Sequence, residues 1–233
     1  MGFLKDSLTI FKKNELSFLK KESEGSNIWT FYFKKPKNLH WHSGQHGLFK
    51  INQKNLKDST RAFTLSSSPT EEFITITTSI KESPSDFKNA LFHLKPDETV
   101  TLNGPVGSFY VKEDKPLYFI AEGIGITPFY SMLKHMSDQN NNHTMKIKLL
   151  YVDKYDRFPF KNHLTTLSQS LPLDIVYLTD ASALSAQLKA SVNEEKEAFY
   201  YIAGSKAFIH DNVKQLKQYN VPSKHIFKDS FFA

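Results

Sequence analysis

The chain has 233 residues, of which 39% are hydrophobic and 14% aromatic, and its 30 basic and 24 acidic residues give a net charge of +6. This length suits one large domain or two ordinary ones. There is no cysteine, which excludes disulfides, thiolate zinc sites, cysteine nucleophiles and an iron–sulfur cluster held by the chain itself. No stretch approaches the roughly 18 apolar residues of a membrane span, and no apolar run of signal-peptide length opens the chain. We therefore expect a soluble, cytoplasmic protein that does not insert into a membrane.

The positive charge comes almost entirely from lysines that are scattered and often stand beside acidic residues. No block has the density of a nucleic-acid-binding arm, so we expect no nucleic-acid partner. A solvated, mildly basic surface is the simplest interpretation, and attraction of an acidic protein partner is the alternative. Only two of the 30 basic residues are arginines, Arg61 and Arg157. Because lysine supplies nearly all the positive charge, we expect these arginines where the planar guanidinium is required. A guanidinium can donate to two oxygens of a phosphate or carboxylate.

The first half of the chain, residues 1–113, has the rhythm of short strands. Aromatic and β-branched runs divided by Pro, Gly and Asn occur at residues 28–33, 47–51, 73–78 and 99–102. Strands at this spacing predict an antiparallel β-barrel or sandwich. One helix interrupts them near residues 84–94, where Ser83-Pro84-Ser85-Asp86 is typical of a helix start and Pro96 ends the pattern.

A short stretch in this half combines groups that suit a planar ligand with a phosphorylated tail. It reads Arg61-Ala62-Phe63-Thr64-Leu65-Ser66-Ser67-Ser68-Pro69. On a strand, Arg61 and Phe63 share one face and Thr64 lies on the other. The arginine offers a clamp for phosphate, the phenylalanine a flat ring, and the hydroxyls a row of donors. The alternative is an ordinary strand that ends in a serine-rich turn.

From Pro116 onward, buried apolar runs alternate with amphipathic helical patterns. The runs lie at residues 117–121, 147–152, 175–178, 199–203 and 225–227. This alternation predicts βαβ units, and therefore a five-stranded parallel sheet in an α/β domain that spans residues 114–233.

The loop that follows the first of these runs has the composition of a phosphate-binding turn. It reads Ala121-Glu122-Gly123-Ile124-Gly125-Ile126-Thr127-Pro128 and precedes a helix. Its two glycines let the backbone approach a ligand, Thr127 suits the N-cap, and Pro128 suits the first helical position. A helix N-terminus after a parallel strand is where a pyrophosphate binds, because unpaired amides point outward there. The alternative is a tight corner between strand and helix.

Three motifs occur along the chain in a fixed order: Arg61–Pro69, then Gly104-Pro105-Val106-Gly107-Ser108-Phe109, then Gly123–Pro128. In this order they resemble the flavoprotein superfamily of ferredoxin–NADP reductase. Members of that superfamily join a flavin-binding antiparallel barrel to a pyridine-nucleotide-binding α/β domain. The resemblance covers nearly the whole chain, so this two-domain fold is the expected one.

The resemblance implies which residues hold the flavin. Arg61 would pair with the flavin phosphates, Phe63 would stack on the isoalloxazine ring, and Thr64 would hydrogen-bond near N5. The other residues implied at the flavin are Ala62, Thr78, Ser79, Ile80, Lys81, Ser83, Ser85 and Phe231. The turn that contains Gln45 and His46 would also lie beside it. FAD is the expected flavin, and FMN is the alternative.

The resemblance likewise implies a nucleotide site in the second half. The loop residues Gly123, Gly125, Ile126 and Thr127 would approach the nicotinamide and pyrophosphate, and Gly204 and Ser205 would hold the other end of the nucleotide. Asp229, near the C-terminus, would lie close to the place of hydride transfer, so Thr64 and Asp229 are the catalytic candidates.

The choice of nucleotide rests on the loop at residues 153–157, which follows the second buried run. Lys154 and Arg157 can grip a 2′-phosphate and favour NADPH, whereas Asp153 and Asp156 suit the ribose hydroxyl of NADH. Because arginine is rare in this chain, we expect NADPH. The alternative is a solvated loop of paired charges.

Four features depart from the superfamily pattern. One is that Ala203-Gly204-Ser205 lacks the cysteine that many members have before this glycine. Glu122 stands where glycine is usual and puts a carboxylate near the pyrophosphate path. Asp86 adds a negative charge near the flavin phosphates, and Asp229 is shorter than the usual glutamate. His40-Trp41-His42 has no nearby carboxylate and leads into a turn, so we expect no metal site there.

The predicted function is that of a flavin-dependent NAD(P)H oxidoreductase that passes hydride to FAD and then single electrons to a separate carrier such as ferredoxin or flavodoxin. A small acidic electron carrier would suit the positive net charge. Within enzymes, the alternatives are a free-flavin or ferric reductase and the reductase component of an oxygenase. In another class, the alternative is a non-catalytic binding module that has lost its flavin.

Overall fold

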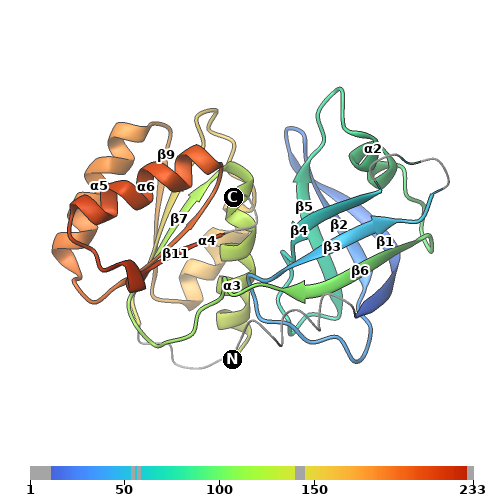
Figure 1. The fold of residues 1–233 in the computed structure, drawn as a ribbon, viewed down its shortest axis with the longest axis horizontal. Coiled ribbons are helices and arrows are strands. Elements are labelled where there is room, and N and C mark those ends of the chain that lie inside the picture. Colours follow the sequence, from blue (N-terminus) through green and yellow to red (C-terminus); the bar gives the residue numbers. More distant parts are fainter. Residues whose placement is uncertain (1–11, 54–55, 57–58, 140–144, 230–233) are drawn as a thin grey trace. The chain divides into compact units, whose positions relative to one another are not determined.

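The structure is a computed structural model that describes residues 12–53, 56, 59–139 and 145–229. Contacts divide the chain into two compact units, Met1–Tyr110 and Val111–Ala233 (Figure 1). Within the described part of the chain, none of the helices has both the length and the apolar character needed to cross a membrane.

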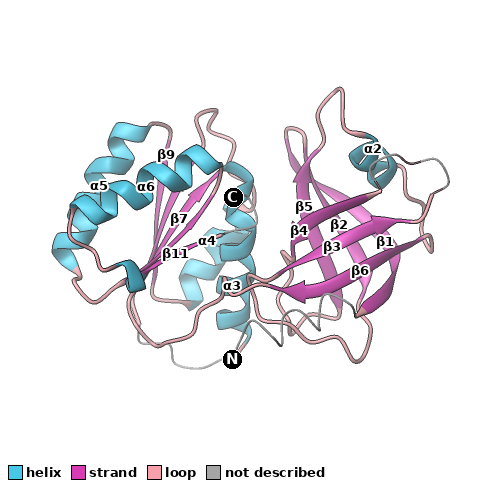
Figure 2. Cartoon of the chain, viewed as in Figure 1, coloured by secondary structure: helices cyan, strands magenta, loops and turns pink. Residues whose placement is uncertain are grey.

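The described residues of the first unit form antiparallel strands and one helix (Figure 2). Their bounds are β1 Lys13–Gly25, β2 Ile28–Lys34, β3 His46–Ile51, β4 Thr60–Thr64, β5 Phe73–Ser79, α2 Asp86–Phe92 and β6 Thr99–Val106. The strands form a six-stranded sheet in the order β4-β3-β6-β1-β2-β5. Just beyond β4, Ser66 N donates to Thr75 O of β5 at 2.9 Å, which brings the two edges of the sheet together. The predicted antiparallel barrel with one helix is therefore confirmed.

Phenylalanine rings fill the core of this unit. The rings of Phe18, Phe31, Phe33 and Phe49 contact one another with centroid distances between 5.8 and 6.5 Å. Burial of such side chains contributes roughly 1.5–3 kcal/mol each. The sequence pattern does not predict β1, because lysines and glutamates surround its two buried side chains, Leu16 and Phe18. Pairing with β2 on one side and β6 on the other forms this strand despite its composition.

The second unit is a parallel sheet covered by helices. Its strands are β7 Leu117–Glu122, β8 Ile147–Val152, β9 Leu173–Leu178, β10 Phe199–Ala203 and β11 Ile226–Lys228. Its helices are α3 Thr127–Asp138, α4 Lys161–Ser170, α5 Ala181–Glu194 and α6 Lys206–Gln218, with 3-10 turns at Gly123–Ile126 and Ser223–His225. The order β11-β10-β7-β8-β9, with every pairing parallel, confirms the predicted five-stranded α/β domain.

Alternate side chains of β7 bury against different helices. Ile120 belongs to one cluster with Leu188 of α5 and Leu216 of α6, whereas the ring of Phe119 stacks on Phe129 of α3 with centroids 4.8 Å apart. Both faces of the strand are therefore covered, which explains its continuous apolar sequence. The chain runs outward from β7 toward β9 on one side and toward β11 on the other, so the order switches between β7 and β10. Ligands of open α/β sheets bind at such a switch, outside the carboxyl ends of the strands.

Candidate functional site

Strand β4 carries the residues predicted to hold the flavin. Arg61 and Phe63 are half-buried, and Ala62 between them is also partly accessible. The Phe63 ring meets Phe49 of β3 at a centroid distance of 5.9 Å and Phe87 of α2 at 5.7 Å. These contacts fix the ring at the margin of the barrel core while part of it stays exposed. That arrangement suits a side chain that offers a flat surface to a planar ligand.

Thr64, the last residue of β4, has a hydroxyl that lacks a partner within the described structure. The residue is only 5% exposed, and no described group forms a hydrogen bond with its buried Oγ1. A buried hydroxyl in this condition costs roughly 1–3 kcal/mol. A ring atom of a bound flavin could satisfy it, so this position fits the cofactor.

The serines that follow Thr64 close the barrel. Ser66 Oγ lies 3.0 Å from the hydroxyl oxygens of both Thr75 and Thr77, and Ser67 Oγ accepts from Thr75 N at 3.0 Å. All four side chains are buried. Their hydrogen bonds join the segment after β4 to β5, which answers the question that the sequence left open about these hydroxyls.

Three cations gather at one place in the first unit. Burial, followed by the positive charges of Lys81 and Arg61, lowers the pKa of Lys88. Lys88 Nζ also donates to Ser79 O at 2.8 Å, which ties α2 to the end of β5. A bound anion beside these side chains would offset their repulsion, and the phosphates of FAD are anions that could lie there. Lys88 is not among the residues predicted from the sequence, although its place in the first turn of α2, three residues after the N-cap Ser85, is a signal that could have found it.

The other residues predicted near the phosphates have more varied positions. Ser85 is the N-cap of α2, where its Oγ accepts from Lys88 N at 3.4 Å. Ser83 is exposed, Thr78 is buried within β5, and Ile80 is half-buried against the barrel core. Ser79 and Lys81 are thus the members of this segment that the structure brings to Lys88.

The turn before β3 is held by its own hydrogen bonds. Gln45 Oε1 accepts from His42 N at 2.9 Å, and Gln45 Nε2 donates to Gly107 O at 2.9 Å. The His42 ring stacks on Tyr110 with centroids 4.4 Å apart. Gln45 therefore joins this turn to the Gly104–Phe109 motif. Among the described residues, no three His, Cys, Asp or Glu side chains gather as a metal site would require.

The loop between β7 and α3 differs from its predicted form. Gly123–Ile126 form a 3-10 turn that continues directly into α3, and Thr127 already has helical angles, φ −55° and ψ −45°. Its Oγ1 donates to Ile124 O at 3.2 Å. The prediction that Thr127 is the N-cap is wrong, because an N-cap needs a non-helical backbone. Pro128 stands in the first turn, as expected.

Gly125 and Gly204 allow the loops after β7 and β10 to touch. A Cβ at Gly125 would lie 2.5 Å from Ala203 O and 2.9 Å from Gly204 N. A Cβ at Gly204 would lie 2.8 Å from side-chain atoms of both Glu122 and Phe208. These two predicted residues therefore meet at the switch point of the sheet. The immediate reason for each glycine is this close packing.

Glu122, the last residue of β7, reaches across to the start of α6. Its Oε2 accepts from Ser205 N at 2.9 Å, while Ser205 caps α6 by accepting from Phe208 N at 3.3 Å. A carboxylate at a helix N-terminus is favourable. The chain thus supplies its own anion at an amide that the sequence assigned to the nucleotide.

A pocket of about 270 Å³ lies beside Glu122, outside the carboxyl ends of β7, β8 and β9. Its eleven lining residues are Glu122, Val152, Lys154, Thr179, Asp180, Ala181, Leu184, Phe208, Asp211, Asn212 and Gln215. Three of them are acidic and one is basic. Hydrogen bonds from the Ser182 hydroxyl and the Ala183 amide lower the pKa of Asp180, which is the N-cap of α5. Asp180 is not among the residues predicted from the sequence. It could have been found by examining the loop after β9 for ligand-binding residues, as was done for the loop after β8.

The two cations predicted to hold a 2′-phosphate have different positions. Lys154 lines the pocket, whereas Arg157 does not. The Arg157 guanidinium lies 4.4 Å from the centre of the Tyr155 ring, and Asp153 Oδ1 accepts from Arg157 N at 3.4 Å. Arg157 is therefore exposed and engaged with its own loop.

Asp229 follows β11 and is 2% exposed, and its N donates to Ile202 O at 3.0 Å. Its proposed part in hydride transfer stays a prediction. Phe231 lies outside the described residues.

Comparison with known families agrees with this two-part arrangement. Residues 14–110 match the oxidoreductase FAD-binding domain, and residues 119–214 match the oxidoreductase NAD-binding domain. The chain belongs to the ferredoxin–NADP reductase-like flavoprotein superfamily. It thus contains an FAD-binding domain and an NAD-binding domain of the oxidoreductase type.

Solved structures share the fold. Ferredoxin–NADP+ reductase from Plasmodium falciparum has a TM-score of 0.77 at 19% identity, with 93% of this chain and 95% of that chain covered. The FAD/NAD-binding domain of nitric oxide dioxygenase from Vibrio cholerae has a TM-score of 0.74 at 18% identity, with 92% and 97% covered.

Curated relatives are longer proteins. The electron transfer component of 2-halobenzoate 1,2-dioxygenase from Burkholderia cepacia is 29% identical over 134 residues, which cover 56% of this chain and 39% of the relative. Flavohemoprotein A from Dictyostelium discoideum is 26% identical over 235 residues, which cover 91% of this chain and 58% of the relative. The chain thus spans between about two fifths and three fifths of the length of these relatives.

Proposed function

We propose that the protein is an NADH-dependent flavoprotein reductase that transfers hydride to bound FAD and passes electrons singly to a separate acceptor protein. The observation that carries the choice of NADH is the acidic lining of the pocket beside Glu122. Support for FAD comes from the Thr64 hydroxyl, which has no partner in the described structure, and from the three cations Arg61, Lys81 and Lys88.

The bound flavin would supply a ring that accepts hydride from a dihydronicotinamide and gives up electrons one at a time. The protein's own residues then bind and orient. Arg61, Lys81 and Lys88 would neutralise the phosphates, and Phe63 would offer its exposed surface to the ring system. Thr64 would donate its hydroxyl hydrogen to a ring nitrogen. No side chain needs to act as a strong base, because hydride transfer would require no proton to be removed by the protein.

NADH is preferred to NADPH for an electrostatic reason. A 2′-phosphate carries about −1.5 to −2 charges at neutral pH. In the pocket it would meet Glu122, Asp180 and Asp211, opposed by Lys154 alone. A ribose 2′-hydroxyl in the same place could instead donate to one of these carboxylates. This proposal replaces the expectation of NADPH, which rested on Lys154 and Arg157.

We infer that the acceptor is a separate protein, since the 233 residues of this sequence include no cysteine that could hold an iron–sulfur cluster. Two of the curated relatives are dioxygenase electron transfer components, from Burkholderia cepacia and from Pseudomonas putida. The reductase component of an oxygenase is therefore the second candidate, in which the acceptor is an oxygenase or its carrier.

The test is to purify the protein, identify any bound flavin by extraction, and compare NADH with NADPH as reductants. We expect a yellow protein that contains FAD and reacts faster with NADH. A colourless protein that cannot be reconstituted with FAD would instead identify a binding module that has lost its flavin.

A further inference from the structure

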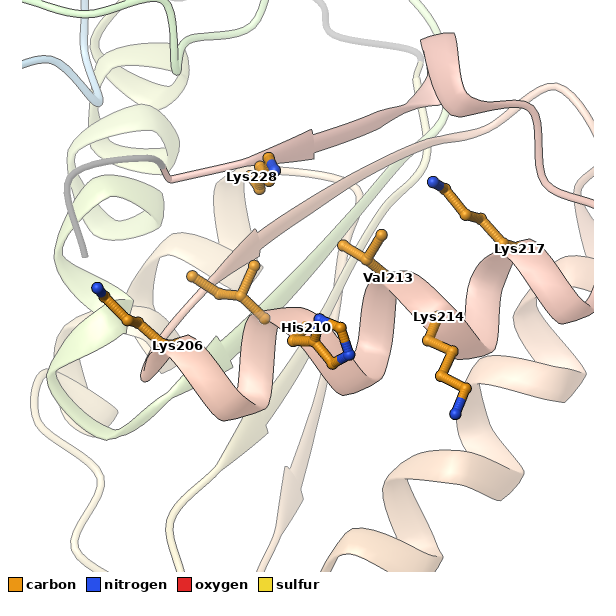
Figure 3. A pocket seen from close by; sticks show the side chains of 7 residues that line it. Lys206, His210, Val213, Lys214, Lys217 and Lys228 are labelled. Atoms are coloured by element: carbon orange, nitrogen blue, oxygen red, sulfur yellow. The ribbon is translucent and has the colours of Figure 1, made fainter. Parts of the chain in front are cut away.

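The second unit contains a groove that the nucleotide and flavin sites do not use. It has a volume of about 550 Å³ and lies between α6 and β11 (Figure 3). Its polar lining consists of Lys206, His210, Lys214, Lys217 and Lys228, and its floor of Ile209 and Val213. None of the described residues that line it is acidic. The groove is thus apolar at its base and positively charged along its margins.

The basic and acidic side chains of α6 lie on different sides of the helix. Lys206, His210, Lys214 and Lys217 recur at intervals of three or four residues, which places them along one side of the helix. Asp211, the acidic residue of α6, lines the pocket beside Glu122 instead. Residues 206–228 contain five lysines and one acidic residue, a net charge of +4 out of +6 for the whole chain. About a tenth of the sequence therefore carries two thirds of the net charge.

The opposite wall of the groove is an edge strand. β11 ends the sheet order and, within the described part of the chain, pairs only with β10. Ile226 packs in the cluster that contains Ile209 of α6, so Lys228, two residues further along the strand, faces the same side. Lys228 therefore stands across the groove from the lysines of α6, as Figure 3 shows.

The dimensions match a short extended peptide. Lys206 and Lys217 are eleven residues apart on α6, a distance of about 16 Å at 1.5 Å per residue. Five residues of extended chain cover about the same length. In an extended peptide, alternate side chains point to opposite sides, so one set can reach the apolar floor while the other meets the lysines.

We propose that this groove binds an extended acidic segment of a partner protein, in which acidic and aliphatic residues alternate. The aliphatic side chains would cover Ile209 and Val213, and the carboxylates would pair with Lys206, Lys214, Lys217 and Lys228. Charge complementarity and the apolar floor together favour this occupant. A nucleic acid fits less well, because the lining has no arginine to grip phosphates, and of its residues His210 alone offers a ring for a base. The proposal does not depend on which nucleotide or acceptor the enzyme uses.

The test measures binding of a fluorescently labelled eight-residue peptide of alternating Glu and Val to the full-length flavin-loaded protein by anisotropy. The Lys214→Glu/Lys217→Glu variant should bind about tenfold more weakly, since two attractions become repulsions. The Lys214→Gln/Lys217→Gln variant should lie between this variant and the unchanged protein. The matched control, Lys189→Glu/Lys196→Glu, makes the same charge change at exposed sites outside the groove and should bind within about twofold of the unchanged protein. Val213→Thr, which keeps the side-chain shape, should weaken binding about threefold to fivefold.

Four results would overturn the proposal. The first is equal loss in the groove and control variants, which would indicate only a long-range charge effect. The second is equally tight binding of a peptide of alternating Glu and Ser, which would show that the floor contributes nothing. The third is tighter binding of a single-stranded DNA oligonucleotide of the same charge. The fourth is self-association of the unchanged protein that Lys214→Glu/Lys217→Glu abolishes, because the occupant would then be a second copy of this chain.

Discussion

Replacing Glu122 by glutamine should shift the preference between the two nucleotides. The amide oxygen of glutamine can still accept from Ser205 N, so the substitution removes a charge and retains the contact with α6. The pocket of about 270 Å³ has the volume of a sphere about 4 Å in radius, so a 2′-phosphate inside it would lie roughly 6 Å from the carboxylate. Two unit charges at that distance interact by about 0.7 kcal/mol in water. With the charge of the phosphate and partial screening by salt, the net repulsion is about 1 kcal/mol.

Glu122→Gln should therefore lower the KM for NADPH about fivefold and change the KM for NADH less than twofold. The assay is initial-rate reduction of a small dye at low ionic strength, and added salt should narrow the difference between the two nucleotides in the unchanged protein. Asp180→Asn should also lower the KM for NADPH, because it removes a negative charge from the pocket. Asparagine can still cap α5, so the fold should be retained. Glu197→Gln, an exposed residue outside the pocket, is the control. An unchanged NADPH-to-NADH ratio in both pocket variants would refute the electrostatic account of specificity.

Three further predictions concern the cofactor sites. Thr64→Val removes a buried hydroxyl that has no partner in the described structure, so thermal melts should show an apoprotein as stable as before or more stable by up to about 1 kcal/mol. Stopped-flow measurements should show flavin reduction slowed about tenfold. Equal slowing in Thr64→Ser, which keeps a hydroxyl, would contradict this role. Lys88→Met should raise the Kd for FAD about tenfold in a fluorescence titration. It should leave the apoprotein about as stable as before, because relief of repulsion among cations offsets the lost hydrogen bond to Ser79 O. Because the pKa of Lys88 is lowered in the folded protein, the unfolded chain binds more protons at pH values between that pKa and 10.5. Through this residue, the free energy of unfolding of the apoprotein should therefore rise with pH across that interval. The pH dependence should vanish in Lys88→Met. Gly125→Ala should lower stability by about 1–3 kcal/mol in urea unfolding, because its Cβ would lie 2.5 Å from Ala203 O, and a loss below 0.5 kcal/mol would contradict the packing that we describe.

Most of the fold can be predicted from the sequence, because the first half has a clear pattern of short strands and the second half a clear alternation of buried strands and amphipathic helices. The apolar runs of the parallel sheet are covered on both faces, and the alternating strand at residues 73–78 corresponds closely to β5, Phe73–Ser79. The exception is β1, in which charged residues conceal Leu16 and Phe18. Its strand conformation comes from pairing with two neighbours, and pairing between distant segments leaves no local signal.

The site is less readable, because several of its features depend on contacts between distant residues. Ser66 and Ser67 looked like ligand donors in the sequence, yet they are bonded to β5. Thr127 looked like an N-cap, but the 3-10 turn before it is already helical. Glu122 was recognisable as a departure from the superfamily pattern. Its bond to Ser205, 83 residues further along the chain, is a property of the folded sheet.

The central claim is that the protein is a FAD enzyme reduced by NADH, and anaerobic stopped-flow mixing tests it most directly. The flavin absorbance of the purified protein is followed after mixing with equal concentrations of NADH or NADPH. We expect the band to bleach with NADH at a rate at least fivefold above that with NADPH, in keeping with about 1 kcal/mol of repulsion. Faster bleaching by NADPH would contradict the choice of nucleotide, and failure of either nucleotide to bleach a fully FAD-loaded protein would contradict the proposed reductase activity itself.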